Sequence, residues 1–356
     1  MNKKLLAVAI GAALTAPMYA ANAAVTVGGQ AHLSADYVDQ YVGADSHKVW
    51  NVSSNVSNIF FKADEDLGGG LHGVAFLQEY FRFDNQYGAA PTTTNGANNR
   101  MFDAPAYAGL SSSSFGSLLL GTMDGPAKLN GRKVDLFGNA IGDSRSLYED
   151  NTRLGNAVVY STPSFAGVTV VVGHSTNLDN NVNTTSGAQL SGNTAAVTYD
   201  QGPLMVGLAY LEASNDADTA LTYAKKKVMN LAASFKIAGA RIVGYYQNIK
   251  ANGNVDGADV DTYGIGASYT FGKETIKAQY YNGTLKNATD VSSNIFAIGY
   301  DHAFSKTFTG YVAIAAASND LGGTVSMTGG GGHGDNVSVP SGENNSGLSL
   351  GIVYNF

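Results

Sequence analysis

The stretch VTVGGQAHLSADY, residues 25–37, shows the pattern from which the fold is predicted. Its odd-numbered positions are apolar or small, from Val25 to Tyr37, while most even-numbered positions are polar, among them His32 and Asp36. Successive side chains of a β-strand point to opposite faces. The stretch therefore predicts a strand with one apolar face and one face that meets water.

The same alternation recurs along the chain, for example at residues 262–271 and 348–356, and no convincing helical period interrupts it. Short and long connections alternate between these segments. This rhythm is typical of a transmembrane antiparallel β-barrel, here of about sixteen strands, and a soluble β-sandwich is the alternative. The short connections include 64–70, 111–116, 162–167, 200–203, 238–239, 271–274 and 304–307, and the long ones 86–100, 123–150, 176–192, 214–226, 251–259, 286–292 and 318–346.

The composition agrees with a barrel wall that meets lipid on one face and water on the other. Charged residues make up 14% of the chain, against about 25% in typical soluble domains. There are 44 glycines, 20 tyrosines and 15 phenylalanines but only one tryptophan, and there is no cysteine for a disulfide. The net charge of −7 argues against binding of nucleic acid.

Residues 1–23 have the order of a secretory signal peptide. Lys3 and Lys4 precede an apolar run from Leu5 to Ala16, and Ala21-Asn22-Ala23 resembles a cleavage site. The run is too short to cross a bilayer as a helix. We expect cleavage after Ala23 and a single barrel domain at residues 24–356, and a buried N-terminal helix is the alternative.

Several segments, in this order, resemble the general (non-specific) Gram-negative porins of the trimeric, sixteen-stranded type. The resemblance implies a water-filled channel for passive diffusion of small hydrophilic solutes and ions across the cell outer membrane, with no enzyme activity, cofactor or metal. It also implies a homotrimer in contact with membrane lipid and lipopolysaccharide, and a C-terminal Phe356 that signals to the barrel-assembly machinery. The segments are FKADEDLGGGL (61–71), AYAGL (106–110), FG (115–116), YSTPSFAG (160–167), YTFG (269–272) and Phe356.

In that family the third long loop folds into the lumen and forms a constriction with charged residues of the wall. The corresponding loop here is 123–150, in which Lys133 to Gly138 resembles the family's pattern. The resemblance makes Asp135 the acidic candidate and Arg153 the basic wall candidate. The further candidates for the pore constriction are Glu79, Lys128, Arg132, Arg82, Arg100 and Lys62, the last because its neighbours Ile59, Phe61 and Ala63 suit the lipid face.

Three positions at which the family often has basic wall residues are here Gln30, Asn58 and Ala104. Their loss predicts a mildly cation-selective pore, since charge in a narrow pore biases ion selectivity. The Gly-rich stretch 324–345 is expected to be a flexible surface loop. The sequence Lys225-Lys226-Lys227 is expected to meet either lipopolysaccharide phosphates or water.

The sequence is also compatible with three other functions: a solute-specific channel, a surface adhesin or receptor, and an enzyme. A solute-specific channel would need Phe60, Phe81 and Tyr281 to stack along one path. A closed-lumen adhesin or receptor would carry its function in the long loops. An enzyme has little support, because the six histidines are scattered and form no close pair. The acidic residues Asp256, Asp259 and Asp261 form either a site for a divalent cation or, as we expect, a solvated loop.

Overall fold

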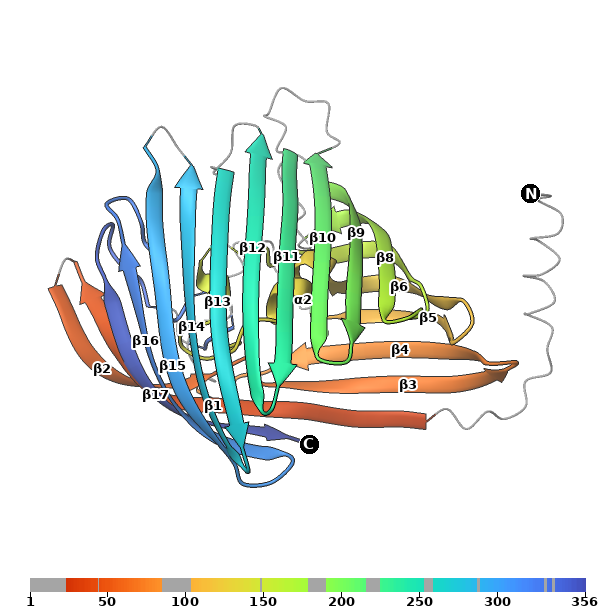
Figure 1. Ribbon diagram of the computed structural model, residues 1–356, viewed down its shortest axis with the longest axis horizontal. Coiled ribbons are helices and arrows are strands. Elements are labelled where there is room, and N and C mark those ends of the chain that lie inside the picture. The colour runs from red at the N-terminus through yellow and green to blue at the C-terminus, as the bar shows by residue number, and fades with distance from the viewer. Residues whose placement is uncertain are drawn as a thin grey trace.

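A computed structural model describes most of the chain as one closed sheet (Figure 1). Residues 1–23, among others, lie outside the described part, and with them the expected signal peptide. The described residues are 24–43, 45–84, 104–147, 149–178, 190–215, 225–252, 259–286, 289–329, 332–334 and 337–356.

The described residues form seventeen antiparallel strands, in agreement with the alternation in the sequence. They are β1 (Ala24–Val42), β2 (Asp45–Ser54), β3 (Asn58–Gly68), β4 (Leu71–Tyr80), β5 (Ala106–Ser112), β6 (Gly116–Asp124), β7 (Arg153–Ser161), β8 (Val168–Leu178), β9 (Leu190–Gln201), β10 (Leu204–Asn215), β11 (Lys225–Ile237), β12 (Ala240–Asn252), β13 (Asp259–Phe271), β14 (Glu274–Lys286), β15 (Val291–Ala303), β16 (Phe308–Asn319) and β17 (Asn345–Asn355).

Sixteen of these strands, β1 and β3 to β17, close the ring. Each pairs with its neighbours in the chain, and β1 pairs with β17, Gln30 lying opposite Asn355. The strand β2 pairs with the C-terminal half of β1, at residues 33–42, and β3 pairs with the N-terminal half, at residues 24–30. Along β1, β3 thus continues the course of β2 after a break at residues 55–57. The expected sixteen-stranded antiparallel barrel is confirmed.

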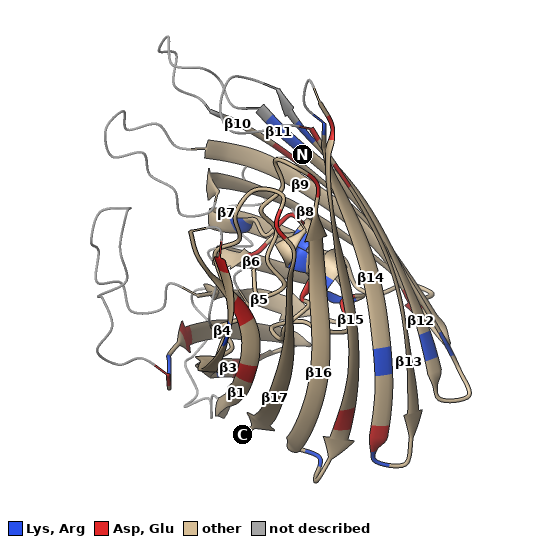
Figure 2. Cartoon of the chain, turned by 90° about the vertical axis from the view of Figure 1, so that its left-hand side faces the viewer, with Lys and Arg blue, Asp and Glu red and all other residues tan. Residues whose placement is uncertain are grey.

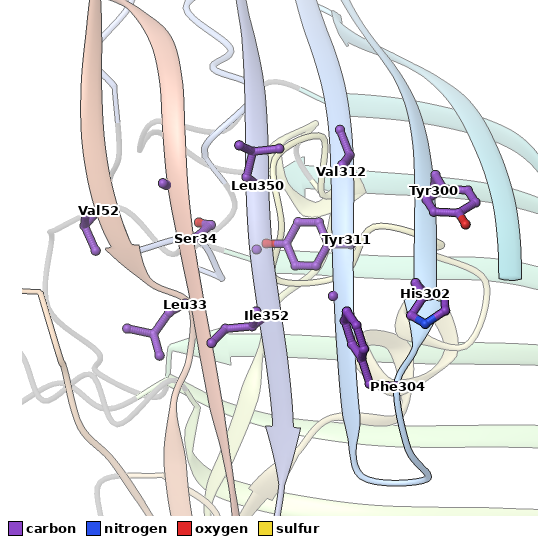
Figure 3. Close-up of a pocket in the computed structure, with 13 residues that line it drawn as sticks. Leu33, Ser34, Val52, Tyr300, His302, Phe304, Tyr311, Val312, Leu350 and Ile352 are labelled. Atoms are coloured by element: carbon purple, nitrogen blue, oxygen red, sulfur yellow. The ribbon is translucent and has the colours of Figure 1, made fainter. Parts of the chain in front are cut away.

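The alternation of faces is visible at the seam between β1 and β17. Figure 3 shows the side chains around a pocket of about 530 Å³ where β1, β15, β16 and β17 lie side by side. On β16, Val312 is 41% exposed on the outer surface. Its neighbour Tyr311 is only 9% exposed, and its hydroxyl hydrogen-bonds to Nε2 of His32 on β1, along the inner wall past β17, at 2.9 Å. Consecutive residues therefore meet different surroundings.

Helix is confined to the loop between β6 and β7 within the described part of the chain. It consists of α2 (Pro126–Arg132) and one 3₁₀ turn, η1 (Ser144–Ser146). No described helix is long and apolar enough to cross a membrane. In Figure 1, α2 lies inside the ring of strands.

One glycine is required where an aromatic ring covers the inner wall. An added Cβ at Gly264 of β13 would lie 2.1 Å from a ring carbon of Tyr281 on β14. The Tyr281 side chain is fully buried, and its hydroxyl reaches the carbonyl oxygen of Val134 in the loop after β6 at 3.5 Å. Gly264 thus lets Tyr281 lie flat between the wall and this loop.

We predict that Gly264→Ala lowers the free energy of unfolding by about 1–3 kcal/mol, because overpacking displaces the ring of Tyr281. Gly244→Ala is the matched control, since an added Cβ there would meet no atom within 4 Å. Urea unfolding of the detergent-solubilised barrel, followed by tryptophan and tyrosine fluorescence, measures the free energy of unfolding of each variant. Equal midpoints for the two variants would contradict the assignment of Gly264.

Candidate functional site

The loop between β6 and β7, residues 125–152, folds into the barrel and is here called the third loop. Asn130 of α2 donates from Nδ2 to the carbonyl oxygen of Gly207 at 2.8 Å and to Oδ1 of Asn230 at 3.0 Å. Asn230 in turn donates to the carbonyl oxygen of Ala127 at 2.8 Å. The helix is therefore tied to the inner faces of β10 and β11. The expected in-folded third loop is confirmed.

Gln279 of β14 holds the middle of the third loop. Its Oε1 accepts from the backbone N–H of Leu136 at 2.8 Å. Its Nε2 donates to Oδ1 of Asp135 at 2.8 Å and to the carbonyl oxygen of Gly142 at 2.9 Å. One buried side chain thus satisfies three polar groups of the loop. No pattern in the sequence indicates this role for Gln279.

The last loop, residues 320–344, also enters the interior, and the expectation of a flexible surface loop is wrong for its described part. Val325 and Met327 are buried with the apolar residues of the third loop. The backbone N–H of Gly142 donates to the carbonyl oxygen of Met327 at 2.7 Å. His333 lies 3.1 Å from the carboxylate of Asp36 on β1. The alternation of apolar residues at 325, 327, 337 and 339 is the signal that could have indicated burial.

Three cations converge on the carboxylate of Asp124 at the third loop. Figure 2 shows basic and acidic segments of the chain, blue and red, inside the ring of strands. Oδ1 of Asp124 lies 2.8 Å from Nζ of Lys128 and 3.4 Å from Nε of Arg153. Its Oδ2 lies 3.8 Å from Nη1 of Arg132. Together with Arg82, these three basic residues line an open pocket of about 250 Å³. The structure therefore brings together four of the predicted basic residues, with Asp124, which sequence reasoning missed.

The acids of the third loop point away from this pocket, toward the wall and into the loop itself. Asp143 is fully buried against the guanidinium of Arg145. Asp150 accepts from Nζ of Lys226 on β11 at 2.7 Å. Asp135 accepts from Gln279 and from the N–H of Phe137 at 2.9 Å. These contacts make Asp135 a carboxylate that positions the loop.

Burial and the neighbouring carboxylate of Asp143 raise the pKa of Asp135. Burial opposes ionisation of Asp143 too, but the charge and hydrogen bonds of Arg145 lower the pKa of Asp143 below its usual value. Burial, followed by the charge of Asp135, raises the pKa of Glu149. The guanidinium of Arg145 therefore favours the ionised form of Asp143 and compensates its charge.

Glu79 and Lys62 lie apart from this cluster. Glu79 pairs with Ile59, which faces outward with Phe61, so Glu79 lies on the outer face and its expected lumen position is wrong. The register leaves Gln78 and Tyr80 on the inner face. Lys62 lies on the inner face of β3, as predicted. Arg100 lies outside the described residues.

Phe356 lies on the outer surface at the seam. Its N–H donates to the carbonyl oxygen of Gly29 at 3.1 Å, and the N–H of Gly29 donates back at 2.9 Å. Its ring is 51% exposed. The terminal residue thus completes the pairing of β17 with β1.

Phe60, Phe81 and Tyr281 do not form the stacked path that the solute-specific channel would need. Tyr281 is buried behind the third loop, and Phe81 makes an edge contact with Phe83. Phe60 instead stacks on Phe76, with ring centroids 5.5 Å apart, and Phe76 stacks on Tyr107 at 5.4 Å. The inner wall therefore carries a different row of three stacked rings.

In the part of the chain that the structure describes, no three His, Asp or Glu side chains lie close enough to hold a metal ion. Asp261 accepts from Nδ2 of Asn248 at 2.8 Å, and Asp256 lies outside the described residues.

Comparison with known proteins places the chain in a family. The family described as Gram-negative porin matches residues 6–323. An outer membrane porin protein of Bordetella pertussis is 26% identical over 309 residues, which cover 76% of this chain and 78% of that protein.

Solved structures show the same fold. The anion-selective porin from Comamonas acidovorans has a TM-score of 0.78 at 24% identity, covering 94% of this chain and 100% of that chain. The trimer form of OmpT from Vibrio cholerae has a TM-score of 0.68 at 14% identity, covering 94% and 99%. With the closed barrel and the constricted lumen, these matches lead to one assignment. The chain belongs to the Gram-negative porin family, and it is a non-enzymatic channel for passive diffusion across the outer membrane.

Proposed function

We propose that this porin is anion-selective and that Lys128, Arg132 and Arg153 carry the selectivity. The observation that supports the proposal is their convergence on the single carboxylate of Asp124. Three positive charges against one negative charge leave an excess of positive charge beside the open pocket. Such an excess in a narrow, water-filled passage attracts anions and repels cations.

The orientation of the third loop strengthens this excess. Its buried acids are compensated by Arg145 or by Lys226 of the wall, whereas Arg132 remains partly exposed to the lumen. The sign is opposite to the mild cation selectivity expected from Gln30, Asn58 and Ala104, because that expectation counted wall positions alone. The Comamonas relative is described as anion-selective, which agrees with the proposal.

We also propose that the mature protein begins at Ala24 and assembles as a homotrimer in contact with lipid and lipopolysaccharide. The outer face of β1 near the seam carries the small residues Ala31 and Ala35, which allow close packing, while Gly29 accommodates the ring of Phe356. The OmpT structure is described as a trimer form. The exposed terminal ring of Phe356 supports its reading by the barrel-assembly machinery. Intact mass and chemical cross-linking of the purified protein test the first two points, and deletion of Phe356 tests the third.

We predict that wild-type protein in a planar bilayer gives a reversal potential favouring chloride under a KCl gradient. Arg132→Gln combined with Arg153→Gln should lower the chloride-to-potassium permeability ratio roughly fivefold, since a unit charge about 4 Å from an ion contributes about 1 kcal/mol even in water. The matched control is Lys273→Gln combined with Lys306→Gln, which removes two exposed charges in the short turns. A potassium-favouring wild-type potential would contradict the proposal.

We predict that Gln279→Ala loosens the third loop, because the N–H of Leu136 loses its acceptor at a cost of roughly 1–3 kcal/mol. The expected result is a lower unfolding temperature and a noisier open-channel current. Gln201→Ala, at an exposed strand end, is the control. Identical current noise in the two variants would show that Gln279 does not hold the loop.

A further inference from the structure

We propose that a second cavity in the lumen, beside the third loop, binds small organic anions with an apolar body, such as aromatic carboxylates. The proposal rests on the anion selectivity proposed above and names a solute class for it. The cavity measures about 400 Å³ and lies between the third loop and the inner faces of β4 to β9. Its lining includes Phe76, Tyr107, Leu119, Val159, Val171 and Leu129.

The apolar lining departs from the alternation of apolar and polar residues that gives the wall its two faces, and the cavity leaves it open, whereas inward apolar residues such as Val243 and Ala297 pack in clusters with the third loop. The interior of a membrane barrel with a water-filled channel is normally polar. Three neighbouring strands here carry apolar runs instead, LLL at 118–120 in β6, VV at 158–159 in β7 and VVV at 170–172 in β8. Each run places apolar residues on both faces, so the lipid side alone does not explain it. A local departure from the fold's pattern points to a functional role.

These inward residues face an open space. Leu118 and Leu120 are 43% and 53% exposed on the outer surface, whereas Leu119 between them lines the cavity. In the same way Val171 lines the cavity between the exposed Val170 and Val172. Apolar surface that meets water in a cavity favours an apolar ligand, because binding removes that surface from water.

The stacked pair Phe76 and Tyr107 makes one side of the cavity flat. Flat aromatic faces favour planar rings, which stack on them or meet them edge-on. The shape of this wall therefore suits an aromatic ring better than a branched aliphatic group.

The charges around the cavity select the sign of the ligand's polar group. Lys133, which follows α2, lines the cavity and is exposed. Asp124 also lines it, but its carboxylate is shared by Lys128, Arg132 and Arg153. The net charge of these groups is positive, which complements a carboxylate. A solute that arrives through the basic pocket can thus keep its anionic group near these cations while its ring contacts the wall.

The test is block of the chloride current by benzoate and by acetate in a planar bilayer containing the full purified porin. Benzoate should reach half-block at a concentration roughly tenfold or more below that of acetate, because the phenyl ring gains from burial. Equal half-block concentrations would overturn the inference. If the half-block concentrations are equal but the reversal potential in the same membranes still favours chloride, the proposed anion selectivity stands and only the site for aromatic anions is excluded.

Isosteric variants locate the site. Val159→Thr combined with Val171→Thr should raise the half-block concentration of benzoate about fivefold or more, since each hydroxyl makes the wall polar at nearly constant volume. Val74→Thr, on the inner face of β4 and outside the cavity lining, should leave it unchanged. Lys133→Gln should also raise the half-block concentration of benzoate, because it removes a positive charge from the cavity lining. Benzoate block that survives both cavity variants would overturn the assignment to this cavity.

Discussion

The rest of the structure depends on one constraint, that backbone N–H and C=O groups within a membrane must pair inside the protein. The sixteen-stranded ring meets it because β1 closes onto β17, down to the reciprocal hydrogen bonds between Gly29 and Phe356. Closure leaves lipid on one side of each strand and the lumen on the other. The alternation of apolar and polar residues follows from that geometry, and so does the hollow interior in which transport takes place.

Two loops then narrow the hollow interior. The third loop is held by side chains of the opposite wall, Asn230 and Gln279 above all, and the last loop packs against it through Met327. This packing turns the buried acids of the third loop toward Arg145 and the wall. The basic residues around Asp124 remain beside the open pocket. The charge that a solute meets is therefore set by which side of the loop each residue faces, and the equal numbers of acids and bases in the loop do not reveal it.

Sequence reasoning reached the parts of the structure that depend on periodicity. The alternation at residues 25–37 and in similar segments predicts the barrel, and the apolar neighbours Ile59, Phe61 and Ala63 predict the inward Lys62. The prediction for Glu79 is wrong because the residues around it fit two strand registers, and only the pairing with Ile59 decides between them. The tie between Gln279 and the third loop spans 144 residues to Asp135, and no local pattern encodes such a contact. The burial of the last loop was obscured by its glycines, although alternating valines and a methionine were present.

The central claim is that consecutive wall residues meet lipid and water in turn. Because the chain has no cysteine, Leu118→Cys and Leu119→Cys each introduce a single thiol on opposite faces of β6. The decisive measurement is the rate at which a charged, membrane-impermeant thiol reagent modifies each variant in lipid vesicles. The account predicts rapid modification at position 119 and protection at position 118. Equal rates at the two positions, or the reverse order, would contradict it.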